Sequence, residues 1–176
     1  SYNTAVGYAA GLAVTTGVQN TLIGGLAGDA LTDADYNTAV GYSALTSDTL
    51  GSRSVAMGNG SLATQNFTTS TNAYNVALGY DAGNDLTTGV NNTLIGGLTG
   101  DALTDADHNL AVGQFALSSD TLGSRTVALG NNALSTQNFT TATDTYNVAV
   151  GYNAGTAVTT GTLNTLIGGL ARDALT

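Results

Sequence analysis

The stretch "NTAVGYAAG" at residues 3–11 returns in close variants along the whole chain, and this repetition decides the fold. The steps between successive motif glycines are 17, 17, 17 and 21 residues, and this series then starts again. The chain therefore has two nested periods, a rung of 17 or 21 residues and a block of four rungs. The ten motif glycines are Gly7, Gly24, Gly41, Gly58, Gly79, Gly96, Gly113, Gly130, Gly151 and Gly168.

The positions around each glycine form fixed columns. Asn stands four residues before the glycine in eight of the ten rungs, and Ser54 and Thr126 replace it in the other two. The residue directly before the glycine is always Val, Ile, Leu or Met, and the residue before that is always Ala or Leu. We expect the Asn column to form a ladder of side-chain amides. We expect the glycine to form a corner whose backbone conformation is unfavourable for residues with a side chain.

The segment between Asn and glycine, such as residues 4–6, has the composition of a strand and is far too short for a helix. Both faces of this strand are apolar or small, which is typical of parallel strands packed on both sides. A rung of 17 residues is also too short for a strand–helix–strand unit. The sequence therefore predicts an all-β fold, in which residues 1–176 form one repetitive parallel β-solenoid or β-roll.

The two faces of the strand compete for the interior of this solenoid. We expect Val6, Ala10 and Val14 to fill the core of the first rung, and their equivalents to fill the other rungs. The Ala/Leu column then points outward as a continuous apolar stripe, which predicts association into a homotrimer. This stripe comprises Ala5, Leu22, Ala39, Ala56, Ala77, Leu94, Ala111, Ala128, Ala149 and Leu166.

Composition excludes several classes of function. The chain has 12 acidic and 3 basic residues, and its net charge of −9 disfavours binding to nucleic acid. Lys, Glu and Cys do not occur, and the single histidine, His108, stands in a column of tyrosines, so we expect no enzyme and no required cofactor. No apolar run approaches the roughly 20 residues of a membrane helix, so we expect no membrane insertion by this segment. We also expect it to be a section of a longer chain.

The motif resembles two families of surface fibres. "NTAVGYSA" at 37, "NVALGYDAG" at 75 and "NVAVGYNAG" at 147 resemble repeats of phage tail fibres that often precede an intramolecular chaperone domain. "RSVAMG" at 53 and "RTVALG" at 125 are similar to the head repeats of YadA-type trimeric autotransporter adhesins. The resemblance covers the whole chain and implies a homotrimeric, extracellular fibre that attaches to a host-surface receptor. The rung is longer than the typical repeat unit of an adhesin head, which favours a structural shaft of a phage or virion fibre, and the head of a cell-surface adhesin is the alternative.

Acidic loops make Ca²⁺ the one candidate metal, because this ion prefers oxygen ligands. The loop "GDALTDAD" occurs at 28 and at 100, although its spacing matches no known calcium loop, and a solvated acidic turn is the alternative. Asp48 and Asp120, each five residues before an arginine (Arg53 and Arg125), are candidates for local ion pairs. The candidate calcium ligands are Asp29, Asp33, Asp35, Asp101, Asp105 and Asp107.

A second candidate site is the column directly after the motif glycine. It holds Tyr8, Tyr42, Tyr80 and Tyr152, with Gln114 in the same position of another rung. If these rings face solvent, they and the nearby Asn and Asp residues could hold sugars, which makes a glycan one candidate receptor. Packing over the corner or against a neighbouring subunit is the alternative. An interrupted column of threonines leaves ice binding as a more remote alternative.

Overall fold

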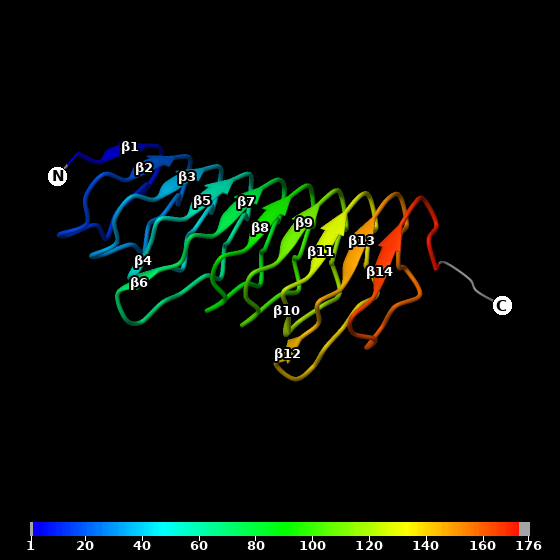
Figure 1. Ribbon diagram of the computed structural model, residues 1–176. Helices are drawn as coiled ribbons and strands as arrows, with labels where there is room; N and C mark the ends of the chain where they lie inside the picture. The colour runs from blue at the N-terminus through cyan, green and yellow to red at the C-terminus, as the bar shows by residue number, and fades with distance from the viewer. Residues whose placement is uncertain (1, 173–176) are drawn as a thin grey trace.

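The computed structural model describes residues 2–172 and contains a β-solenoid of parallel strands stacked along one axis (Figure 1). One ten-stranded sheet runs along the whole length, so the predicted fold class is confirmed. The described residues form no helix, and therefore none that is long and apolar enough to cross a membrane. The sheet consists of β1 (Thr4–Val6), β2 (Thr21–Ile23), β3 (Thr38–Val40), β5 (Val55–Met57), β7 (Val76–Leu78), β8 (Thr93–Ile95), β9 (Leu110–Val112), β11 (Val127–Leu129), β13 (Val148–Val150) and β14 (Thr165–Ile167).

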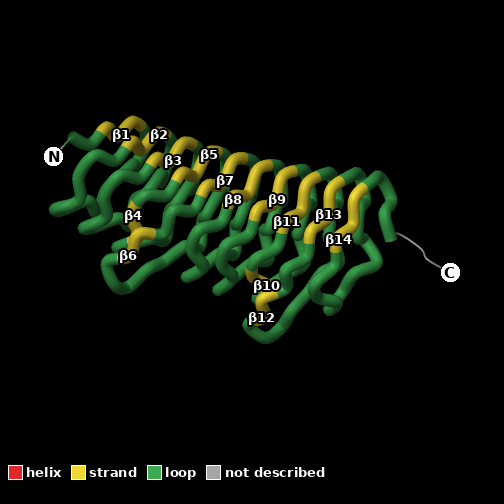
Figure 2. The backbone as a smooth tube through the Cα atoms, viewed as in Figure 1, coloured by secondary structure: helices red, strands yellow, loops and turns green. Residues whose placement is uncertain are grey.

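Two small parallel pairs mark the long rungs. Strand β4 (Gly51–Ser52) pairs with β6 (Thr71–Asn72), and β10 (Gly123–Ser124) pairs with β12 (Thr143–Asp144). Figure 2 shows both pairs on the side of the solenoid away from the long sheet. The extra residues of each long rung therefore form a local bulge on that side, and the long sheet keeps its regular register.

Every rung stacks on its equivalent in the next rung. The strands pair without offset, so that Val6 lies beside Ile23 and Ile23 beside Val40. Backbone hydrogen bonds continue this stacking outside the strands, for example from the Leu45 N–H to the Ser61 carbonyl oxygen at 3.0 Å. Because the same contact recurs at each level, a residue type that suits one rung suits the whole column.

The Asn column forms the predicted ladder, but its main partners are backbone groups. Asn20 Oδ1 accepts from the backbone N–H of Asn37 at 2.9 Å, and its Nδ2 donates to the Ala34 carbonyl oxygen at 2.7 Å. Asn37 repeats both contacts with the N–H of Ser54 and the carbonyl oxygen of Gly51. Each buried amide thus links two rungs at the start of the strand and satisfies backbone groups that have no ladder partner there.

The inward face of the strand differs from the prediction. Leu22, Ala39 and Leu94 of the Ala/Leu column are fully buried, whereas Val6 is 58% exposed. Ala10 and Val14 do pack against the core, as predicted. The column before the glycine therefore points outward, and the predicted outward stripe of Ala and Leu is wrong. The sequence did not reveal this because both faces of each strand are apolar or small.

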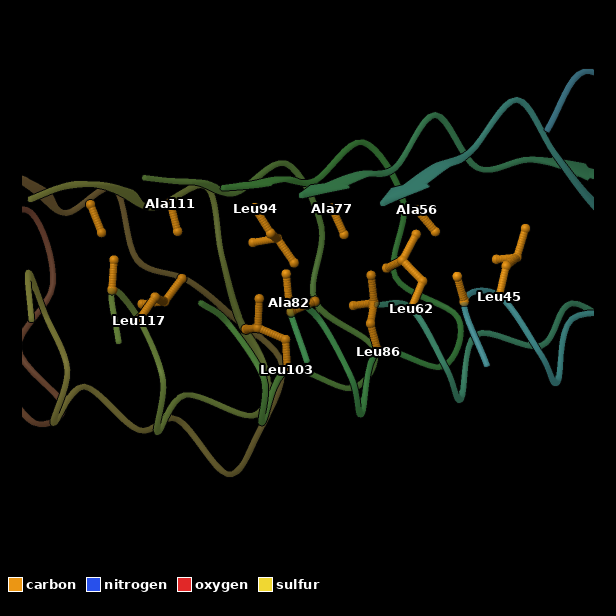
Figure 3. Packing of buried hydrophobic residues seen from close by; sticks show 14 of the residues in the cluster. Leu45, Ala56, Leu62, Ala77, Ala82, Leu86, Leu94, Leu103, Ala111 and Leu117 are labelled. Carbon is orange, nitrogen blue, oxygen red and sulfur yellow. The ribbon is translucent and has the colours of Figure 1, made fainter. Parts of the chain in front are cut away.

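The interior is narrow, and large side chains enter it from opposite walls in different rungs. Where the strand contributes Leu22, the facing corner has Gly28, whose added Cβ would lie 2.8 Å from the Leu22 side chain. Where the strand contributes Ala39, the same corner position holds the fully buried Leu45. Figure 3 shows the same alternation in the middle of the solenoid. Leu94 points down from the sheet, whereas Leu62 lies on the opposite wall, below Ala56 of the sheet. This exchange keeps the core close-packed, because total volume is conserved.

The corner glycines have a backbone conformation that side chains rarely adopt. Gly96 has φ of +137°, and a Cβ there would lie 2.7 Å from the carbonyl carbon and oxygen of Gly113. Its neighbour Gly97 has no such constraint, because its added Cβ would meet only the Tyr80 oxygen at 3.9 Å. Adjacent glycines of one rung therefore differ sharply in what they tolerate.

We expect Gly96→Ala to lower the free energy of unfolding by roughly 3 kcal/mol, because the new Cβ adds backbone strain and a clash with the next rung. The matched control, Gly97→Ala, is expected to change it by less than about 0.5 kcal/mol. Denaturant unfolding followed by circular dichroism measures both. Equal effects of the two substitutions would contradict the assigned role of the corner glycine.

Candidate functional site

The outer face of the long sheet is an uncharged surface of aliphatic and threonine side chains. Ile23 and Met57 are 39% and 43% exposed on this face, although each lies between neighbouring strands. The outward position nearest the glycine is always Val, Ile, Leu or Met, and the other outward position is Thr, Val or Leu. The outward apolar stripe predicted for the Ala/Leu column is therefore formed by these two columns instead. The first comprises Val6, Ile23, Val40, Met57, Leu78, Ile95, Val112, Leu129, Val150 and Ile167.

Most of the candidate calcium ligands are occupied by donors of the same chain. Asp29 Oδ1 accepts from the Thr46 hydroxyl at 2.6 Å, and Asp33 Oδ1 accepts from the Thr16 hydroxyl at 2.6 Å. Asp35 Oδ1 accepts a backbone N–H at 2.7 Å. In the next block, Asp105 and Asp107 make the corresponding contacts with Thr88 and the Val90 N–H. These carboxylates therefore hydrogen-bond to a neighbouring rung.

Asp101 differs from its equivalent Asp29. Its Oδ1 is buried and has no hydrogen-bond partner among the described residues. Burial, and to a lesser degree the charges of Asp85 and Asp81, raises the pKa of Asp101. Within residues 2–172, no group of three or more acidic, His or Cys side chains is gathered closely enough to hold a metal ion. The calcium site stays a prediction, and this arrangement adds nothing in its favour.

A buried polar cluster that links the long rung to the rung before it is the main feature that sequence reasoning missed. Asp48 Oδ2 accepts from Gln65 Nε2 at 2.6 Å, and Asp48 Oδ1 accepts from the Phe67 and Gly51 N–H groups at 3.0 Å. Gln65 Oε1 in turn accepts from Asn75 Nδ2 at 2.9 Å. Asp48, Gln65 and Asn75 are fully buried. The signal was available, because Asp48 and Gln65, with Asp120 and Gln137 of the next block, interrupt a column that holds only Val or Leu in the other rungs.

The cluster repeats one block later with the same chemistry. Gln137 Nε2 donates to Asp120 Oδ2 at 2.6 Å, and Asn147 Nδ2 donates to Gln137 Oε1 at 2.8 Å. Asp120 Oδ1 accepts from the Phe139 N–H at 2.9 Å. A buried network is favourable only when every member is satisfied. The block period of the sequence therefore corresponds to a recurrent polar layer in an otherwise aliphatic core.

The arginines lie on the surface, away from the carboxylates that sequence proximity suggested. The Arg53 guanidinium carbon is 4.6 Å from the ring centroid of Tyr36 and 5.9 Å from that of Tyr74. Arg125 Nε lies 2.9 Å from an Asp144 oxygen. The predicted pairs with Asp48 and Asp120 are wrong, because those carboxylates point into the core.

The tyrosines after the motif glycine face solvent. Tyr42, Tyr80 and Tyr152 are 58%, 59% and 60% exposed, and Tyr8 in the first rung is 83% exposed. The Tyr42 ring also leans toward the preceding rung, where an added Cβ at Gly25 would lie 3.3 Å from Tyr42 Cδ2. The rings are therefore exposed, as the sugar-binding alternative requires, and that of Tyr42 also lies beside a corner, while sugar binding itself stays a prediction.

Other candidate features do not assemble a catalytic arrangement. His108 is exposed, and its Nε2 lies 3.5 Å from Asn91 Nδ2. No pocket is found on the part of the chain that the structure describes. No protein-family model, curated protein or solved structure matches this chain. Function is therefore inferred from the surface columns and the repeat.

We expect Gln65→Leu to lower the free energy of unfolding by about 3 kcal/mol, because it removes the hydrogen bonds that Gln65 makes to the buried Asp48 carboxylate and Asn75 amide. The control is Gln19→Leu, at an exposed position in a column where Leu163 already occurs. That control is expected to change stability by less than about 0.5 kcal/mol. Chemical unfolding of both variants measures the difference, and a tolerated Gln65→Leu would show that the cluster is dispensable.

Asp48 also predicts a pH dependence. Burial raises the pKa of Asp48 above its usual range, and the hydrogen bonds from Gln65, Phe67 and Gly51 offset only part of this effect. The native state then holds this proton more tightly than the unfolded chain, so the contribution to stability is largest at low pH and is lost as pH rises through the native pKa.

We therefore expect the melting temperature of the wild type, relative to Asp48→Asn, to increase as pH falls from 7 to about 4.5. The other carboxylates titrate in both proteins, so the difference isolates Asp48. Scanning calorimetry at several pH values measures it. A difference that shrinks toward low pH would contradict the assigned direction.

Proposed function

We propose that this segment is a non-enzymatic structural shaft of an extracellular homotrimeric fibre, as in a phage or virion fibre that attaches to a host. The observation that carries the proposal is the long sheet, whose uncharged aliphatic outer face runs the length of the described solenoid. Contiguous apolar surface of this kind usually marks an interface. Localisation on a virion or a bacterial cell surface follows from the resemblance of the repeats.

The rung is suited to making length. Ten strands at a spacing of about 4.8 Å extend about 48 Å, and each further rung adds one more hydrogen-bonded layer. Stability in such an array comes from the rungs and the contacts between neighbours, so length is not limited by one central core. These properties fit a spacer that holds another domain away from a surface.

A second copy of the same chain is the partner that best fits the outer face. Its outward columns have the same spacing, so side chains of two copies meet at the same interval along the whole contact. No charged residue stands in these columns, so association through this face buries none of the carboxylates behind the net charge of −9. Closed rotational symmetry about the fibre axis then gives each chain an equivalent environment, and the trimer follows the resemblance.

The head of a trimeric cell-surface adhesin is the second candidate. The copies "RSVAMG" and "RTVALG" favour it, and they form β5 and β11 in the same sheet as the other motifs. Ice binding has less support. Its threonine column is engaged within the solenoid, where Thr32 Oγ1 donates to the Thr49 carbonyl oxygen at 3.0 Å and Thr104 Oγ1 donates to that of Thr121.

We expect the wild-type chain to have three times its monomer mass at about 10 µM, and Ile95→Asp to shift it to the monomer. The substitution places a charge in the middle of the outer face, where association would bury it without a partner. Ser119→Asp is the matched control, because it adds the same charge at an exposed position outside the sheet. Size-exclusion chromatography with light scattering measures the masses. A monomeric wild type would overturn the homotrimer, and an unchanged Ile95→Asp trimer would place the interface elsewhere.

A further inference from the structure

The column after the motif glycine has a period of two rungs. Tyrosine occupies the first, third, fifth and ninth rungs, and Gln114 takes the place of tyrosine in the seventh. The intervening rungs carry only small or polar residues, namely Gly25, Asn59, Gly97, Asn131 and Gly169. We call Tyr8, Tyr42, Tyr80 and Tyr152 the tyrosine row.

This row follows the stacking of the rungs, because the backbone of the column is hydrogen-bonded from rung to rung. The Tyr8 carbonyl oxygen accepts from the Leu26 N–H at 2.8 Å, and the Tyr42 carbonyl oxygen accepts from the Gly60 N–H at 3.0 Å. The Tyr80 carbonyl oxygen makes the same contact at 2.8 Å. Two strand spacings separate Tyr8 from Tyr42 and Tyr42 from Tyr80, which places these rings about 9.5 Å apart along the axis. Tyr152 lies four spacings beyond Tyr80, because the seventh rung between them holds Gln114.

The rings stay available to a ligand. More than half of the surface of each tyrosine in the row is exposed. In the second column of tyrosines, one residue before the Asn ladder, two rings have a cation nearby. There Arg53 lies 4.6 Å and 5.9 Å from the ring centroids of Tyr36 and Tyr74, so these rings already interact with a cation. Among the described residues, no cation is recorded over a ring of the tyrosine row.

Hydrogen-bonding side chains lie beside the row. Ser43, Asp81 and Asn153 directly follow three of the tyrosines. Asn153 also accepts from Asn132 Nδ2 at 3.0 Å, so this amide is held in place. An aromatic face flanked by amides, hydroxyls and carboxylates has the chemistry that holds a sugar, since the ring packs on the C–H face and the polar groups bind hydroxyls.

The regular step selects the kind of sugar. An extended β-1,4-linked polysaccharide turns each sugar over relative to the last, so it presents the same face once per disaccharide. The length of that disaccharide is close to two strand spacings. An anionic polysaccharide is disfavoured, since Asp81 lies beside the row and the chain carries a net charge of −9, so we take a neutral one.

We propose that the tyrosine row binds a neutral, extended β-1,4-linked polysaccharide along the solenoid axis, with one disaccharide for every two rungs. This inference deepens the proposed function, because it names the receptor class for a surface fibre, and it rests on that function for its biological role. The contact itself involves one chain and does not require a trimer.

The test compares two double variants by isothermal titration calorimetry with cellohexaose and chitohexaose, two neutral β-1,4-linked hexasaccharides. The row variant is Tyr42→Asn with Tyr80→Asn, a residue that the column already holds at Asn59 and Asn131. The control is Tyr36→Asn with Tyr74→Asn, in a column that already holds Asn91. We expect wild type to bind at least one hexasaccharide at least tenfold more tightly than its disaccharide. We expect the row variant to lose about tenfold in affinity and the control to change by less than about twofold.

Several outcomes would overturn the proposal. These are no binding of either hexasaccharide, equal weakening by both double variants, or equally tight binding of maltohexaose, which has α-1,4 linkages. Light scattering on the same samples separates a protein interface from a sugar site, because a row variant with a changed oligomeric mass assigns the tyrosines to subunit contacts. A monomer that binds the sugars would refute the homotrimer alone, and a trimer that binds neither would refute the sugar site alone.

Discussion

The structure depends on the requirement that each rung stack on its equivalent with no offset. Backbone groups of one rung find their partners in the next, in the strands and in the corners between them. Every column must therefore hold residues that tolerate contact with their own kind one strand spacing away. Asn meets this requirement because its amide both donates and accepts, as Asn20 does toward the neighbouring rung. Glycine meets it at the corner, where the Gly113 backbone approaches Gly96 too closely for a side chain.

Strict repetition has a cost that the long rungs address. Ten similar rungs offer many shifted pairings, and an aliphatic core distinguishes poorly between them. The Asp48–Gln65–Asn75 cluster and its second copy interrupt this uniformity once per block. A buried polar group is favourable only opposite its own partner, so a shifted rung would leave a carboxylate unsatisfied. The exchange of Leu22 against Gly28 adds a second distinction, because only one arrangement of large and small residues fills the interior.

The same stacking that builds the solenoid turns single side chains into surfaces. One aliphatic residue per strand becomes a continuous apolar face, and tyrosines at alternate rungs, interrupted once by Gln114, become a row. Neither surface requires a pocket, and each presents its groups at intervals that the backbone sets. The functions proposed for this segment therefore reside in columns, and a ligand or partner that matches their period would gain from many weak contacts at once.

Much of this architecture could be predicted from the sequence, because a fixed period with a fixed Asn and Gly in each unit has few structural solutions. The all-β solenoid, the amide ladder and the glycine corner all follow from local chemistry that is identical in every rung. Tertiary structure alone decided which face of the strand points inward, since Ala5 and Val6 are both apolar and only the space between opposing walls distinguishes them. It also decided that Asp48 lies in the core opposite Gln65, and that Asp35 bonds the neighbouring rung. The role of a carboxylate depends on the groups around it in space, and those groups belong to residues a full rung away in the sequence.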